Sequence, residues 1–147
     1  MKYLTLIDKA FLLKRTTPFS SLDLDLLLTV ADKLTLVVFD PGDYIFAIEE
    51  EANRMYFIAK GKVQIQGVTP SPLHTLGTGD FFGEEALFNN SPRAYAAFTP
   101  IETHLLTLSR TNLYTIISEC PSVAVGFLQV YTSRVPLRPF KPMESET

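Results

Sequence analysis

The sequence predicts a mainly β fold, an antiparallel roll or barrel with helices at both ends of the chain. Between about residues 35 and 108, short runs rich in β-branched and aromatic residues recur at close intervals, as strands do. Six of the seven glycines lie in this stretch, most of them between the runs, where turns are expected. On either side, the apolar residues follow a helical period. This spacing favours an antiparallel roll over alternating β-α units.

Helices are predicted over residues 1–34. The apolar residues of the stronger helix fall on one face: Leu24, Leu27, Leu28, Ala31 and Leu34. Ser20 is its expected N-cap, with Phe19 and Leu24 as a hydrophobic staple across the helix start. A second, shorter helix is predicted before Pro18, from Leu4, Ile7, Phe11 and Leu12.

The β-roll is predicted over residues 35–108. Six runs have the composition of strands: 36–39, 44–46, 55–59, 63–66, 95–99 and 103–108.

Two C-terminal helices are predicted over residues 109–135. The first has Ser109 as its N-cap and ends at Pro121, which cannot continue the helical hydrogen bonds. The second begins at Ser122. The tail 136–147 combines three prolines with a polar end and is expected to be extended or disordered.

Composition excludes several classes of protein. The 147 residues are 46% hydrophobic with a net charge of −3, which predicts one domain over 1–147 with a core of its own. Lys and Arg are scattered, so no basic face for nucleic acid is expected. The longest charge-free apolar stretch, 120–133, is shorter than the roughly 18 residues of a membrane span. Asp8 and Lys9 interrupt any signal-peptide core, so we expect a cytoplasmic protein. The single cysteine, Cys120, excludes an internal disulfide.

The segment 79–94 carries the chemistry. Gly83 permits a tight turn, and 84–88 can form one helical turn whose first N–H groups attract an anion. Arg93 follows a proline and presents a planar set of donors suited to a phosphate. Glu84 does not suit an anion, so its carboxylate is expected to accept a hydrogen bond from a hydroxyl, such as that of a ribose.

These residues resemble a known motif. Phe82-Gly83-Glu84, then Ala86-Leu87, then Pro92-Arg93-Ala94, is similar to the phosphate-binding cassette of the cyclic nucleotide-binding domain family. The resemblance extends to Pro41–Phe46 and Met55–Val63, which are similar to early strands of the family's roll, and covers about residues 18–135. It implies an antiparallel β-roll, a jelly-roll-like double-stranded β-helix, of the type found in cAMP receptors and protein kinase A regulatory subunits.

The resemblance also implies roles for individual residues. Arg93, with Ala94 and Ala86, would bind the cyclic phosphate, and Glu84, with Gly83, would bind the ribose. Members that favour cGMP often carry threonine directly after the arginine; Ala94 has no hydroxyl, so cAMP is expected rather than cGMP. No further cofactor, no metal and no catalytic residue is implied.

The family's last helix covers the base as a lid. The residues placed to do so here are Phe127, Val130, Tyr131 and Arg134. Two interpretations remain open, because Phe127, Val130 and Tyr131 also suit a core, and Arg134 suits either the surface or stacking on a purine.

Three features depart from the family pattern. Glu85 stands where an aliphatic residue is usual, residues 49–52 are acidic where glycines are common, and Ala96 and Ala97 replace a hydroxyl residue. The acidic loop is expected to weaken the attraction for an anionic ligand. Glu85 either adds a carboxylate near the proposed phosphate or, at a helix start, faces solvent and favours the helix dipole.

We therefore expect a stand-alone cAMP-binding regulatory module without enzymatic activity, because the short segments outside the fold leave no room for an attached effector. Its C-terminal helices would signal in trans, to an effector protein or to a second copy in a homodimer formed through these helices. The alternative is a ligand-free scaffold or interaction module in which Arg93 and Glu84 form an ion pair. A cupin-like metal enzyme is less favoured, since His74 and His104 are the only histidines and stand thirty positions apart.

Overall fold

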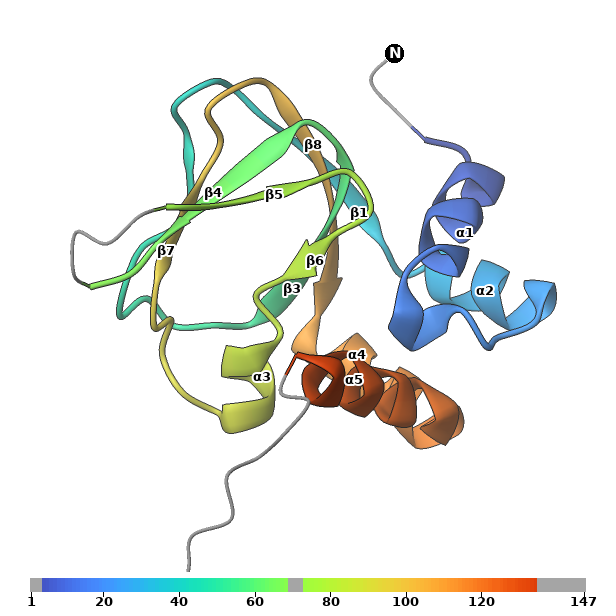
Figure 1. Cartoon of the computed structure of the whole chain (residues 1–147). Helices are drawn as coiled ribbons and strands as arrows, with labels where there is room; N and C mark the ends of the chain where they lie inside the picture. The colour runs from blue at the N-terminus through green and yellow to red at the C-terminus, as the bar shows by residue number, and fades with distance from the viewer. Residues whose placement is uncertain (1–3, 69–72, 135–147) are drawn as a thin grey trace, which may run out of the picture.

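The computed structural model describes residues 4–68 and 73–134, so the predicted tail 136–147 lies outside the described residues. The strands form a roll, and the helices gather along one side of it (Figure 1). The helices are α1 (Leu6–Lys14), the 3-10 helix η1 (Thr17–Phe19), α2 (Leu24–Ala31), α3 (Glu85–Asn89), α4 (Arg110–Glu119) and α5 (Pro121–Ser133). The strands are β1 (Thr35–Phe39), β2 (Tyr44–Phe46), β3 (Arg54–Lys60), β4 (Lys62–Gln66), β5 (His74–Gly77), β6 (Phe81–Phe82), β7 (Ala96–Phe98) and β8 (Thr103–Ser109).

The strands pair in two antiparallel sheets, with orders β1-β8-β3-β6 and β2-β7-β4-β5. The predicted antiparallel β-roll with flanking helices is confirmed, although the eight strands and five α-helices among the described residues make the fold mixed rather than mainly β. All six predicted strands are present. The prediction missed β5 and β6, because β5 contains one large apolar residue, Leu76, and β6 is only two residues long.

The predicted start of α2 is wrong. Asp23, not Ser20, caps the helix, and its carboxylate accepts a hydrogen bond from Leu26 N–H at 3.0 Å. Ser20 ends the 3-10 turn that Pro18 begins, and its hydroxyl donates to the Thr17 carbonyl at 3.0 Å. The proline diverts the chain into this extra turn, which delays α2 by three residues.

The C-terminal helices follow the prediction more closely. Ser109 caps α4 by accepting from Asn112 N–H at 3.1 Å, and the chain breaks at Cys120 before Pro121. The second helix begins at Pro121, one residue earlier than predicted, because proline is well suited to the first position of a helix. Among the described residues, no single helix is long and apolar enough to cross a membrane; α4 and α5 reach that length only together, and they meet at 108°.

Alternate residues of β3 serve two separate cores. Met55 and Phe57 pack outward with the helices, whereas Tyr56 and Ile58 face the inside of the roll. The interior core contains a cluster of aromatic rings, in which Phe46 and Phe82 pack with Tyr56.

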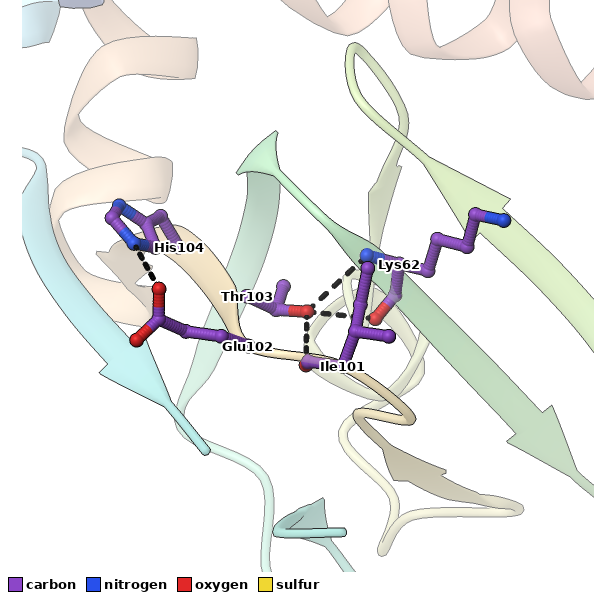
Figure 2. A network of polar contacts seen from close by, with 5 residues as sticks. All are labelled: Lys62, Ile101, Glu102, Thr103 and His104. Atoms are coloured by element: carbon purple, nitrogen blue, oxygen red, sulfur yellow. Dashed lines mark hydrogen bonds and ion pairs between the residues drawn. The ribbon is translucent and has the colours of Figure 1, made fainter. Parts of the chain in front are cut away.

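The β3–β4 turn crosses closely over the chain before β8. The hydroxyl of Thr103 lies 3.0 Å from the Lys62 carbonyl and 2.9 Å from that of Ile101, and it accepts from Lys62 N–H at 3.2 Å (Figure 2). Beside Thr103, Oε1 of Glu102 lies 3.6 Å from Nε2 of His104. Gly61 has φ +110°, and a Cβ there would lie 2.5 Å from the Thr103 hydroxyl oxygen. Glycine is therefore required on both conformational and steric grounds.

We expect Gly61→Ala to destabilise the fold by about 2–4 kcal/mol, from a strained φ together with overpacking against Thr103. Urea denaturation of the purified protein measures this change. Gly77→Ala is the matched control, because Gly77 has an ordinary φ and open space around it. Equal unfolding midpoints for the two variants would contradict the steric argument.

Candidate phosphate-binding cassette

The segment between β6 and β7 forms the predicted tight turn and short helix. Gly83 has φ +86°, and α3 begins directly after Glu84. A Cβ at position 83 would lie 3.0 Å from Nη1 of Arg93 and 3.2 Å from Cδ1 of Tyr56. Glycine is thus needed both for the turn and for the close approach of the arginine.

The guanidinium of Arg93 is buried, with 3% of the residue exposed. Nη1 donates to the Gly83 carbonyl and Nη2 to the Arg54 carbonyl, each at 2.6 Å. The guanidinium carbon lies 4.0 Å from the centre of the Phe46 ring, a cation-π contact. Nε has no hydrogen-bond partner within the described part of the chain. Burial lowers the pKa of Arg93 from its ordinary value.

The acidic loop 49–52 lies beside the arginine but is joined to it only through the backbone. The Arg93 N–H donates to the Glu50 carbonyl, and the Arg93 carbonyl accepts from the Glu49 N–H, both at 2.8 Å. Glu49 has φ +73°, a left-handed conformation that favours glycine. The Glu50 carboxylate instead accepts from Ala47 N–H at 2.9 Å.

Glu84 turns away from the arginine, toward α5. It is 5% exposed, and Oε2 accepts a hydrogen bond from the Tyr131 hydroxyl at 2.9 Å. Oε1 has no partner among the described residues. Burial, followed by the nearby negative charge of Glu85, raises the pKa of Glu84 to about 7. The ion pair between Glu84 and Arg93 considered from the sequence is absent from the described residues.

Tyr95 also belongs to the cassette, although the sequence did not identify it. Its hydroxyl accepts from Gly83 N–H at 3.2 Å and donates to the Glu85 carboxylate at 2.9 Å. Its ring packs against Phe46 with centroids 5.5 Å apart. The available signal was a large aromatic residue directly after Ala94, beside two small residues, Ala86 and Ala94, that were expected to cradle the phosphate.

The space at the cassette is small. Ala86 and Ala94, the residues expected to cradle the phosphate, line a cavity of about 50 Å³ together with Glu85, Arg93 and Tyr95. Arg93 also lines a larger cavity of about 290 Å³, together with Arg54 and Tyr56. Sites for small molecules usually measure roughly 300–1,000 Å³, so the cassette cavity is too small for a nucleotide in this conformation.

Of the four residues considered for a lid, Tyr131 is the one whose side chain hydrogen-bonds a residue expected to bind the ligand, Glu84. Phe127 is 2% exposed and lies in the helical core against Phe19, Phe81 and Phe88. Val130 and Arg134 line a separate cavity of about 240 Å³. The positive charge of Arg134 nevertheless lowers the pKa of Glu84 slightly, against the larger effect of burial.

The two histidines lie in different sheets, His74 on β5 and His104 on β8. Within residues 4–68 and 73–134, no cluster of three or more His, Cys, Asp or Glu side chains is placed to hold a metal ion.

The chain resembles proteins of several organisms. It is 29% identical over 128 residues to the CRP-like cAMP-activated global transcriptional regulator of Mycobacterium tuberculosis, covering 84% of this chain and 57% of that protein, so it spans less than two thirds of that relative. The regulatory domain of Toxoplasma gondii PKA, solved with cAMP, has the same fold with a TM-score of 0.74 and 23% identity, over 88% of this chain and 50% of that one. The regulatory subunit of a cAMP-independent protein kinase A from Trypanosoma brucei gives a TM-score of 0.72 and 25% identity, over 87% and 47%.

The sequence profile of the cyclic nucleotide-binding domain matches residues 36–120, which include the cassette and both sheets. This match covers more than half of the 147 residues. The resemblance inferred from the motif is therefore confirmed, and the chain belongs to the cyclic nucleotide-binding domain family.

Proposed function

We propose that this chain is a non-enzymatic cytoplasmic receptor that binds cAMP at its 79–94 cassette and signals in trans through its C-terminal helices. The observation that carries the proposal is the buried guanidinium of Arg93, which has no carboxylate partner among the described residues. A buried charge that lacks a counter-ion is costly, so an anion that replaces the two carbonyl partners is favoured. A cyclic phosphate is such an anion.

The ribose would bind at Glu84. Oε1 of this buried carboxylate lacks a partner among the described residues, while Oε2 is held by Tyr131. A ribose hydroxyl that donates to Oε1 would therefore share one carboxylate with α5. The absence of a hydroxyl at Ala94 and the similarity to a cAMP-activated regulator both support cAMP over cGMP.

This shared carboxylate would couple the ligand to α5. The helix packs tightly on η1, since a Cβ at Gly126 would lie 2.6 Å from Cα of Pro18. Tyr131 is then the point at which a change in the cassette reaches the helix. Ligand binding would shift α5 between two positions, and an effector or a second copy of the chain would bind one of them.

A ligand-free scaffold is the competing proposal. It is favoured by the cassette cavity of about 50 Å³ and by the carbonyl partners of Arg93. The cAMP-independent kinase subunit from Trypanosoma brucei has a similar fold, so such a role is compatible with the architecture.

We expect saturable cAMP binding to the purified chain, measured by titration calorimetry, and its loss in Arg93→Ala. Because alanine also leaves the Gly83 and Arg54 carbonyls unpaired, Arg93→Lys separates binding from folding. Lysine keeps the charge but loses the bidentate geometry, which should weaken cAMP binding by about 10- to 100-fold.

Arg15→Lys at the end of α1 is the matched control and should bind cAMP as the wild type does. If the wild type releases no heat with either cAMP or cGMP at millimolar ligand, and Arg93→Ala only lowers stability, the scaffold is the correct function.

We expect the stability of the wild type to fall as the pH rises from about 4.5 to 7. The unfolded carboxyl of Glu84 ionises near 4.5, whereas the folded one holds its proton to about 7, so the native state binds more protons in this window. Glu84→Gln removes this loss and should gain stability relative to the wild type with rising pH, by on the order of 3 kcal/mol at pH 8.

Urea denaturation at pH 4, 6 and 8 measures the difference. Glu119→Gln, at an exposed site on α4, is the control and should track the wild type. A constant difference between Glu84→Gln and the wild type at all three pH values would mean that Glu84 ionises normally.

A further inference from the structure

Tyr95 forms a hydrogen bond with a residue, Gly83, that the resemblance assigns to ligand binding. Its hydroxyl accepts the N–H of Gly83, one of the backbone donors expected to complete the cradle. Its ring lies in the interior core between the cassette and Phe46, and it helps to line the cavity of about 50 Å³. The ring and the hydroxyl of Tyr95 thus lie at the place expected for a nucleotide.

Glu85 anchors this arrangement. Its carboxylate is on the exposed side of α3 and accepts from the Tyr95 hydroxyl at 2.9 Å. A hydrogen bond between a phenol and a carboxylate is stronger than one between neutral groups. The aliphatic residue usual at this position in the family could not form this bond. The departure at Glu85 and the large residue at position 95 therefore act together.

We infer that Tyr95 and Glu85 form an internal latch that closes the cassette, so that a cyclic nucleotide binds only after the Tyr95 side chain has swung out. The inference rests on the proposed function, because the latch would set the affinity of the same cAMP site. The apparent dissociation constant of such a site is the intrinsic one divided by the fraction of molecules in the open state. The latch would keep the receptor insensitive to low ligand concentrations.

Three variants test the latch. Tyr95→Phe keeps the ring but removes both hydrogen bonds, Glu85→Gln weakens the anchor without removing it, and Tyr95→Ala removes the obstruction itself. We expect cAMP binding, measured by calorimetry, to tighten in all three, by about tenfold in Tyr95→Phe and by more in Tyr95→Ala. Tyr44→Phe, at an exposed tyrosine on β2, is the matched control and should leave the affinity unchanged.

Hydrogen exchange supplies a readout that does not depend on the ligand. The Gly83 amide is bonded to the Tyr95 hydroxyl, so it should exchange faster in Tyr95→Phe than in the wild type and at the wild-type rate in Tyr44→Phe. This comparison also holds if Tyr95→Ala fails to fold.

The outcomes separate the latch from the function. If the wild type and Tyr95→Phe bind cAMP equally tightly, the latch is wrong while the receptor function stands. If no variant binds cAMP or cGMP, including Tyr95→Ala in folded form, the receptor function fails and the latch has no ligand to exclude. Tighter binding in Tyr95→Phe, together with faster Gly83 exchange, supports both.

Discussion

The cassette depends on a cation buried without a counter-ion. Arg93 is almost fully enclosed, and among the described residues its guanidinium meets two carbonyl oxygens and the faces of the Phe46 and Tyr56 rings, with no carboxylate in an ion pair. Carbonyl dipoles and ring faces stabilise a guanidinium less than a carboxylate does, which is consistent with its lowered pKa. The surrounding chain must therefore hold these carbonyl groups and rings close to the guanidinium. Gly83, directly after β6, places its carbonyl at the guanidinium, and β3 supplies the Arg54 carbonyl.

The two cores follow from this requirement. The interior of the roll contains the aromatic rings that surround the guanidinium, and the outer core attaches the helices to the opposite face of the same sheet. β3 contributes side chains to both cores and its Arg54 carbonyl to Arg93, so one strand contacts both the arginine and the helical side. The second connection is more direct, because Glu84 on the cassette shares a hydrogen bond with Tyr131 on α5. The fold thus joins the cassette to α5 by a side-chain hydrogen bond.

The sequence predicted the parts of this arrangement that depend on local pattern. Strand composition located six of the strands, proline located the break between α4 and α5, and the motif located the turn at Gly83. It could not predict β6, whose two residues are in a strand only because β3 lies beside them. Nor could it predict the direction of Glu84, which depends on where α5 packs, or the role of Tyr95. Both are contacts between residues distant in the chain, 47 positions apart for Glu84 and Tyr131. In each case tertiary contacts, rather than propensity, determined the outcome.

All three groups expected to hold a nucleotide already have partners within the chain: Gly83 N–H with Tyr95, Glu84 with Tyr131, and Arg93 with two carbonyls. At Gly83 and Arg93 a ligand would exchange hydrogen bonds for others of similar strength, whereas Oε1 of Glu84, which has no partner among the described residues, would gain one. The anionic phosphate is the exception, because it alone would add a full negative charge beside the buried guanidinium. The opposing cost is space at the cassette, since the cavity that Ala86 and Ala94 line with Tyr95 measures only about 50 Å³ and the Tyr95 ring would have to move before a purine enters there. If the proposed function holds, affinity would be a balance between one strong charge interaction and the displacement of a packed ring, and substitutions that act on either side of that balance would move the chain between receptor and scaffold.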